Sequence, residues 1–364
     1  MDTKIERLLK WSKGGKAPPL SLELSPTLRC NLNCLFCWRY GKKDINYGDE
    51  ITLKKYKEII EEAADFGVKE VRIIGGGEPL LRRDTLEIMK AIKSRGMFGY
   101  ICTNGTLFTK EMIETLVKIN WDHIKISLHG YCAETNDHLV QEPGAFKKCV
   151  EVLSMFRDSK KDIREKPYLE IGFVLVKYNY KEIEAMVHLA HRLGVQALFI
   201  EPITIYTELG KRLKPDKDDY KIFEKMAIKA KEKAERLGIE TNLSNFIGSK
   251  FIEKTGEMID LIGEDIANKT NDFFSTACYE PWYRIGIRTD GAVCPCGFFD
   301  QGTTENIKNK SLKEIWYGDY FNKRRGQLLQ KNLPEYCKKC CVTLVVNNKI
   351  IRHELEKFRF LSSK

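Results

Sequence analysis

Three cysteines, Cys30, Cys34 and Cys37, lie within a stretch of eight residues. Thiolates packed this closely repel one another and oxidise easily, so a chain that keeps three of them usually has a metal that holds them. Structural zinc almost always takes four protein ligands, whereas three cysteines on one loop leave one metal position open. A cubane iron–sulfur cluster held by three thiolates would therefore have one iron available to an outside ligand. Spacing alone also allows half of a zinc site.

A second group of cysteines lies near the C-terminus. The stretch 283–293 alternates with period two and is broken by Asp290-Gly291, which predicts a β-hairpin. The hairpin and a distant C-x-x-C motif together offer at least four thiolates to one centre. Thiolates in this number suit zinc and an iron–sulfur cluster equally well. The cysteines of this region are Cys278, Cys294, Cys296, Cys337, Cys340 and Cys341.

The elements that position the first cysteine loop alternate between strand and helix. Mostly apolar strands separated by amphipathic helices predict a parallel sheet covered by helices, in about six βα units. Periodicity does not distinguish a doubly wound sheet from a barrel. In both, ligands bind at the carboxyl ends of the strands, where the cysteine loop lies. The predicted strands are 20–28, 70–74, 100–103, 123–128, 169–176 and 197–203, and the helices are 53–66, 84–94, 110–119, 145–156 and 181–193.

Other strand ends carry residues that could bind a ligand. Gly75-Gly76-Gly77-Glu78 follows the second strand, where glycines let the backbone approach a ligand closely and Glu78 brings a carboxylate. Thr103-Asn104 ends the third strand and Ser127 ends the fourth. Each signal also has an ordinary interpretation as a turn or as a serine bonded to local backbone.

The loop of Cys30, Cys34 and Cys37, with the aromatic Phe36 before its last cysteine, resembles the signature of the radical S-adenosylmethionine (SAM) family. The resemblance implies a partial barrel of six βα units and a [4Fe-4S] cluster on these three cysteines. In that family the open iron chelates the amino and carboxylate groups of SAM. One electron then cleaves the sulfonium, and the 5'-deoxyadenosyl radical removes a hydrogen atom from a substrate.

The same resemblance suggests roles for the strand-end residues. Gly76, Gly77 and Glu78 resemble the GGE motif that contacts the methionine amino group of SAM. Thr103 and Asn104 resemble the TNG segment of the same pocket, and Ser127 stands where a polar side chain reaches the ribose. Glu170 and Glu201 are charged residues in strands predicted to be buried, so each is either paired or in contact with SAM or substrate. No residue is identified as the base.

The C-terminal cysteines resemble the shortened SPASM type called twitch, which implies one auxiliary [4Fe-4S] cluster. Cys278, Cys296, Cys337 and Cys340 match its ligand spacing. Cys294 and Cys341 lie off the pattern and are alternatives for the fourth ligand. The further cysteines of a full SPASM domain with two auxiliary clusters are absent after Cys341.

The expected fold is therefore α/β, a partial (β/α)6 TIM-like barrel followed by a small cysteine-rich domain. We expect a leader helix and loop at 1–19, the barrel at 20–209 and a helical linker at 210–277. The auxiliary cluster domain follows at 278–345, and a tail at 346–364.

Composition narrows the class of protein. The 364 residues contain twelve cysteines, no stretch apolar enough to span a membrane and no apolar secretion signal, so we expect a cytoplasmic protein with metal sites and not disulfides. The net charge of +10 is a mild excess of 61 basic over 51 acidic residues, and helical stretches such as 221–236 mix both signs. The sequence has no basic stripe interleaved with aromatic residues, so we do not expect nucleic acid as the substrate.

The predicted function is a radical SAM oxidoreductase that removes hydrogen from a small molecule, with flavodoxin or ferredoxin as the reducing partner. The 19 residues before the first strand are too few for a peptide leader-binding domain, which favours the small molecule. The alternatives are modification of a peptide or protein and, in another class, a non-catalytic zinc or iron–sulfur protein.

Overall fold

The computed structural model describes residues 3–42, 45, 47–162, 165–248, 272–296, 303, 305–334, 337, 340 and 342–361. Of the features predicted from the sequence, the stretch 249–271 of the linker and Cys341 lie outside the described residues.

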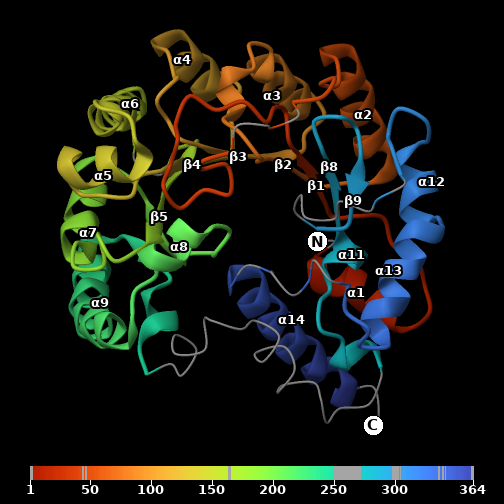
Figure 1. The fold of residues 1–364 in the computed structure, drawn as a ribbon. Coiled ribbons are helices and arrows are strands. Elements are labelled where there is room, and N and C mark those ends of the chain that lie inside the picture. Colours follow the sequence, from red (N-terminus) through yellow and green to blue (C-terminus); the bar gives the residue numbers. More distant parts are fainter. Residues whose placement is uncertain are drawn as a thin grey trace.

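The described chain forms one nine-stranded sheet in the order β7-β6-β5-β4-β3-β2-β1-β8-β9. All neighbouring strands are parallel except β8 and β9, which form an antiparallel hairpin. Strands β7 and β9 are the two edges, so the sheet is an open, partial barrel (Figure 1). The strands are β1 (Ser21–Leu24), β2 (Glu70–Ile73), β3 (Phe98–Thr103), β4 (His123–Ser127), β5 (Tyr168–Leu175), β6 (Ala197–Pro202), β7 (Glu240–Thr241), β8 (Arg284–Ile287) and β9 (Val293–Cys294).

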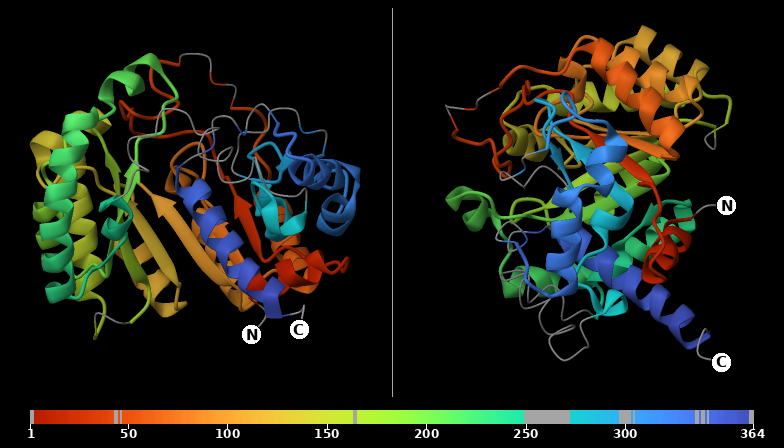
Figure 2. Two further views of the ribbon diagram at one scale, coloured as in Figure 1. Left: turned by 90° about the horizontal axis from the view of Figure 1, so that it is seen from below. Right: turned by 90° about the vertical axis from the view of Figure 1, so that its right-hand side faces the viewer.

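Helices cover the outer face of the barrel, and further helices lie beside its open side (Figures 1 and 2). They are α1 (Lys4–Ser12), α2 (Leu53–Phe66), α3 (Thr85–Ser94), α4 (Lys110–Lys118), α5 (Ala133–Val140), α6 (Ala145–Asp158), α7 (Ile183–Arg192), α8 (Glu208–Leu213), α9 (Lys217–Leu237), α11 (Glu280–Tyr283), α12 (Leu312–Tyr317), α13 (Asp319–Leu329) and α14 (Val342–Leu361). No helix among the described residues is long and apolar enough to cross a membrane.

Helix α2 illustrates how sequence determines these elements. The hydroxyl of Thr52 accepts a hydrogen bond from the backbone N–H of Lys55 at the start, and Gly67 in the left-handed conformation ends the helix. Between these caps the buried side chains recur at helical spacing, at Tyr56, Ile59, Ile60 and Ala63. Burial of one large apolar side chain contributes about 1.5–3 kcal/mol, so this stripe fixes the helix on the sheet.

The two faces of the sheet differ in chemistry because alternate residues of a strand point to opposite sides. Residues such as Leu22, Ile73 and Ile126 are fully buried in the core beneath the helices. The concave face is polar instead, with Arg72 beside Tyr100 and Lys125 beside Glu170 in neighbouring strands. The interior of the barrel is therefore lined by charge.

Every strand and helix predicted between 20 and 209 is present, with ends that differ by at most four residues. The predicted hairpin over 283–293 is confirmed by the pairing of β8 with β9. Several features were not predicted, and three of them matter most for the architecture. Helix α5 lies in a stretch expected to be a polar loop, β7 extends the sheet beyond residue 209, and α14 occupies most of the expected C-terminal tail.

Candidate active site and auxiliary cysteine site

The first cysteine loop lies at the carboxyl end of β1, as predicted, between that strand and α2. The end of α5 fixes the loop, because the N–H groups of Asn33 and Leu35 donate to the carbonyls of Val140 (3.2 Å) and Leu139 (2.9 Å). A turn within the loop closes with a 3.0 Å hydrogen bond from the N–H of Cys37 to the carbonyl of Cys34. The unpredicted helix thus positions the cysteines.

Burial raises the pKa of the Cys30, Cys34 and Cys37 thiols, and for Cys34 the neighbouring Cys37 and Cys30 raise the pKa further. Three thiolates here need a compensating positive centre. Within the described ranges, no three His, Cys, Asp or Glu side chains meet around a point where one ion could bind all of them. Three cysteines on one loop leave one position of a four-iron cluster open, whereas structural zinc almost always takes four protein ligands, so the donor set fits an iron–sulfur cluster better than a structural zinc ion.

The glycine run after β2 packs directly against the start of the cysteine loop. A Cβ on Gly77 would lie 2.1 Å from the carbonyl oxygen of Arg29, and one on Gly76 would lie 2.4 Å from the Leu28 side chain. The N–H of Glu78 donates to the same Arg29 carbonyl at 2.7 Å. The glycines therefore let this backbone pack closely against the cysteine loop, and the predicted approach to a ligand stays a prediction.

Glu78 joins the ends of β2 and β3. Its buried carboxylate accepts hydrogen bonds from the Thr103 hydroxyl (2.6 Å) and from the N–H groups of Asn104 (2.7 Å) and Leu80 (3.0 Å). Burial raises the pKa of Glu78, and these hydrogen bonds oppose that rise. The amide of Asn104 in turn donates to Asn31 of the cysteine loop at 2.9 Å. The structure therefore brings the three-cysteine loop, Gly76–Glu78 and Thr103–Asn104 together at one edge of the sheet.

Ser127 lies half-buried at the end of β4, beside Gly172 of β5. Near it is His129, a residue that the sequence analysis missed. The Nδ1 atom of His129 accepts a hydrogen bond from the N–H of Val174 (3.1 Å), and its ring contacts Phe36 edge-on with centroids 4.8 Å apart. Burial and then Lys125 lower the pKa of His129 to about 3, so its imidazole is neutral and carries its proton on Nε2.

Lys125 is the centre of a charged cluster on the concave face. Its ammonium lies 3.1 Å from Glu170 Oε1 and 2.5 Å from Glu201 Oε1. The other Glu170 oxygen lies 3.0 Å from His123 Nε2. Burial alone would lower the pKa of Lys125, but Glu201 and other neighbours outweigh burial and raise it well above its usual value. Both glutamates that the sequence singled out are thus paired with one buried lysine.

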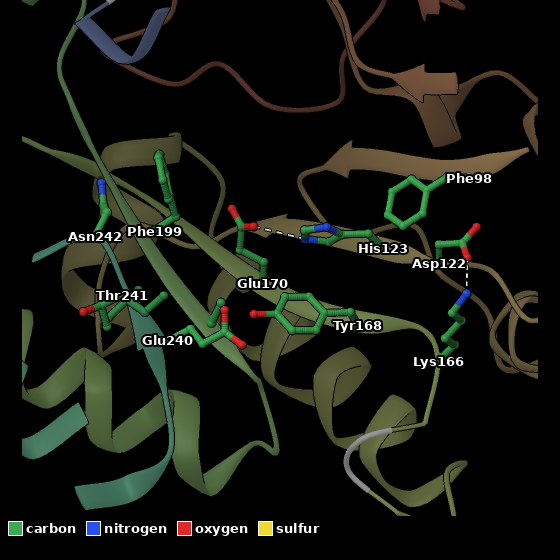
Figure 3. Close-up of a pocket in the computed structure, with 12 residues that line it drawn as sticks. Phe98, Asp122, His123, Lys166, Tyr168, Glu170, Phe199, Glu240, Thr241 and Asn242 are labelled. Atoms are coloured by element: carbon green, nitrogen blue, oxygen red, sulfur yellow. Dashed lines mark hydrogen bonds and ion pairs between the residues drawn. The ribbon is translucent and has the colours of Figure 1, made fainter. Parts of the chain in front are cut away.

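A cavity of about 620 Å³ opens at the opposite, amino end of the strands. Its walls include His123 and Glu170 from the charged cluster, and Asp122 paired with Lys166 (Figure 3). The aromatic side chains of Phe98, Tyr168 and Phe199 supply much of the remaining surface. The cysteine loop lies at the other end of the strands, so this cavity is separate from the candidate active site.

The C-terminal cysteines also converge in part. Burial raises the pKa of the Cys296 thiol well above its usual value, and the nearby Cys278, Cys294 and Cys337 thiols add to the effect. The Cys294 thiol donates to the Gly286 carbonyl at 3.8 Å, within the hairpin. Cys340 follows Cys337 in a turn closed by a 3.2 Å backbone hydrogen bond. The fourth ligand stays a prediction, with Cys341 outside the described residues.

A buried ion network connects this second site to the barrel. Arg284, the first residue of β8, lies 3.0 Å from Glu23 of β1 and 2.9 Å from Glu280, which is two residues beyond Cys278. Both carboxylate side chains are almost completely inaccessible to solvent. This link could not be predicted from the sequence, because it depends on the parallel pairing of β1 with the distant β8.

Residues 24–196 match the model of the radical SAM superfamily, and residues 278–341 match that of the SPASM iron–sulfur cluster-binding domain. The PqqA peptide cyclase of Rhizobium meliloti (strain 1021) is 25% identical over 332 residues, which cover 89% of this chain and 80% of that protein. The AdoMet-dependent heme synthase of Methanosarcina barkeri (strain Fusaro / DSM 804) is 28% identical over 320 residues, or 86% of this chain and 88% of that protein.

Solved structures share the fold. Streptococcus suis SuiB bound to the precursor peptide SuiA superimposes with a TM-score of 0.65 at 22% identity, covering 88% of this chain and 69% of that chain. The protein anSMEcpe with bound AdoMet gives a TM-score of 0.63 at 16% identity, covering 95% and 99%.

Proposed function

Because the chain belongs to the radical SAM superfamily and carries a SPASM iron–sulfur cluster-binding domain, we propose that it uses SAM to abstract a hydrogen atom from a peptide, which it then oxidises. The observation that carries the proposal is the convergence of the three-cysteine loop, Glu78 and Asn104 at the carboxyl edge of the sheet. Ligands of α/β barrels bind at this edge.

When bound, the first cluster supplies the electron that breaks the sulfonium, and the auxiliary cluster supplies an acceptor for a second electron. Cys30, Cys34 and Cys37 would hold the first cluster. Cys278, Cys296, Cys337 and Cys340 would hold one auxiliary cluster. Glu78, Thr103 and Asn104 shape the pocket for the methionine end of SAM, and Ser127 stands at the edge where the ribose would lie. A flavodoxin or ferredoxin is the proposed reductant.

A peptide substrate is supported by two observations. The PqqA peptide cyclase resembles this chain over 89% of its length. The concave face also carries Arg72, Lys125, Glu170 and Glu201, and such a surface suits a polar peptide segment better than the broad apolar face of a tetrapyrrole, against which buried charges would lose their hydration.

A small molecule, which the sequence favoured over a peptide, is the second candidate. The specific observation in its favour is the AdoMet-dependent heme synthase, which is 28% identical and of which the matched region covers 88%. A tetrapyrrole would then replace the peptide at the same edge of the sheet.

Anaerobically reconstituted enzyme, SAM and a reductant should be incubated either with a displayed library of random peptides or with iron coproporphyrin, an iron-bound tetrapyrrole that tests the second candidate. The proposal predicts formation of 5'-deoxyadenosine together with peptides that have lost two hydrogens. Product from iron coproporphyrin alone would favour the second candidate and overturn the first. A matched reaction with the Cys34→Ala variant should yield neither 5'-deoxyadenosine nor product.

A further inference from the structure

Three carboxylates inside the barrel differ in how fully the protein engages them: Glu78 and Glu201 lie towards the carboxyl ends of the strands, and Glu170 lies nearer their amino ends. Glu78 accepts three hydrogen bonds, which use both of its oxygens. One oxygen of Glu170 lies 3.1 Å from the Lys125 ammonium, and the other lies 3.0 Å from His123 Nε2. Neither has an oxygen left over for a substrate without first breaking a buried contact.

Glu201 is different. Its Oε1 lies 2.5 Å from the Lys125 ammonium, and none of the described residues engages its Oε2. The side chain is 39% exposed, compared with 13% for Glu170. Its position near the end of β6 places it towards the edge of the sheet where the cysteine loop lies. Glu201 therefore combines a fixed oxygen with an accessible one.

The fixed oxygen is held rigidly. Lys125 is pinned between Glu201 and Glu170, and His123 holds Glu170 from the far side. Gly172 makes room for this arrangement, because a Cβ there would lie 2.4 Å from Lys125 Cε. A carboxylate oriented in this way by a partner meets the geometric requirement for a general base, which must present one oxygen to the proton it removes.

We propose that Glu201 is the base that takes a proton from the substrate, with Lys125 as its positioning residue. This inference rests on the proposed function. A hydrogen atom leaves a substrate C–H bond for the 5'-deoxyadenosyl radical, which becomes 5'-deoxyadenosine. The substrate radical then loses one electron, which passes to the auxiliary cluster, and one proton from a neighbouring N–H or O–H bond, which passes to Glu201. The substrate has lost two hydrogens and gained one new bond.

The first test needs no substrate. SAM-bound holoenzyme is treated with a water-soluble carbodiimide and glycinamide, and modified carboxyl groups are located by peptide mapping. The proposal predicts modification of Glu201 and none of Glu78 or Glu170. Glu240, an exposed carboxylate at the amino end of the sheet, serves as the positive control for the reagent. An unmodified Glu201 beside a modified Glu240 would overturn the proposal.

The second test uses the peptide selected from the library, deuterated on carbon. Wild type should transfer deuterium to 5'-deoxyadenosine and form the oxidised product. Glu201→Gln should still transfer deuterium but form about 100-fold less product per 5'-deoxyadenosine, because general-base catalysis is worth about 10²–10⁴ in rate. Glu201→Asp keeps a carboxylate and should recover most of the product, whereas Glu240→Gln should match wild type.

Two results would contradict the role of Glu201. Wild-type product yield from Glu201→Gln would show that another group takes the proton. Equal loss of deuterium transfer and product would show that Glu201 only binds the substrate. If the wild type takes deuterium from no peptide, the proposed peptide function is contradicted instead. The carbodiimide result would still decide whether Glu201 has an accessible oxygen.

Discussion

At the scale of single residues, the site depends on side chains whose protonation the fold controls. His129 is neutral because it is buried and lies near the Lys125 cation. Its Nδ1 atom accepts a backbone hydrogen bond from Val174, and its ring contacts Phe36 beside the last cysteine of the loop. Protonation of this imidazole would therefore disturb its hydrogen bond with Val174 and its contact with Phe36 in the cysteine loop.

This leads to a prediction about pH. The pKa of His129 is lowered to about 3, whereas a histidine in the unfolded chain has a pKa of about 6.5. Between these values the unfolded state binds more protons, so the stability that depends on neutral His129 is lost as the pH falls through this window. From pH 7 to pH 4.5 the loss is about 2–3 kcal/mol, at about 1.4 kcal/mol per pH unit below 6.5.

The measurement is urea unfolding of the apo protein at the two pH values. In His129→Asn the amide oxygen replaces Nδ1 as the acceptor for Val174 and does not titrate. The difference in stability between variant and wild type should therefore change by about 2–3 kcal/mol over this range. A difference that does not vary with pH would contradict the assignment of a buried neutral imidazole.

At the scale of elements, the contact between the glycine run and the cysteine loop is the tightest link in the site. Gly77→Ala would place a Cβ 2.1 Å from the Arg29 carbonyl oxygen, which is backbone and cannot rotate away. We predict a loss of about 1–3 kcal/mol in unfolding free energy and loss of SAM binding, because overpacking that shifts backbone is costly.

A matched control is Gly326 in α13, where an added Cβ meets nothing within 4 Å. Gly326→Ala should raise the unfolding free energy by about 0.5–1 kcal/mol, because alanine loses less backbone entropy in a helix than glycine. Chemical unfolding and SAM titration check both variants. Equal stability of Gly77→Ala and wild type would refute the claim that the glycine run positions the loop.

The sequence predicted the elements of the barrel well because the strands and helices have clear local periodicity. It also predicted that the three-cysteine loop and the ends of the second and third strands meet at one edge of the sheet, since the order of parallel strands places those ends together. It missed α5 because the stretch Ala133–Val140 is polar and its N-cap residue, Cys132, makes no capping hydrogen bond. It could not place Glu201 against Lys125, because the face that a charged residue occupies in a buried strand depends on register with distant strands.

At the scale of the whole molecule, the parallel pairing of β8 with β1 makes the C-terminal cysteine region continuous with the barrel. Arg284 neutralises part of the charge at this junction between Glu23 and Glu280. Helix α14 adds a second link, because it contacts β6, α1 and the short 3-10 turn Phe273–Ser275. The strands next to the two cysteine sites therefore belong to one continuous sheet.

Arg284→Met should lower the unfolding free energy by about 3–5 kcal/mol, because it leaves two buried carboxylates without their cation. The double variant Glu23→Gln with Arg284→Met should recover part of this loss. Guanidinium unfolding followed by tryptophan fluorescence measures both. An unchanged stability in the single variant would show that the junction does not depend on this ion pair.

The central claim is that Cys30, Cys34 and Cys37 hold a cluster whose open iron binds and cleaves SAM. The most direct measurement is iron content and SAM cleavage after anaerobic reconstitution of wild type and Cys34→Ala. We predict about eight irons per chain and formation of 5'-deoxyadenosine for wild type, from two four-iron clusters. Cys34→Ala should retain about four irons and cleave no SAM. Bound zinc without iron in the wild type, or SAM cleavage at the wild-type rate by Cys34→Ala, would contradict the claim.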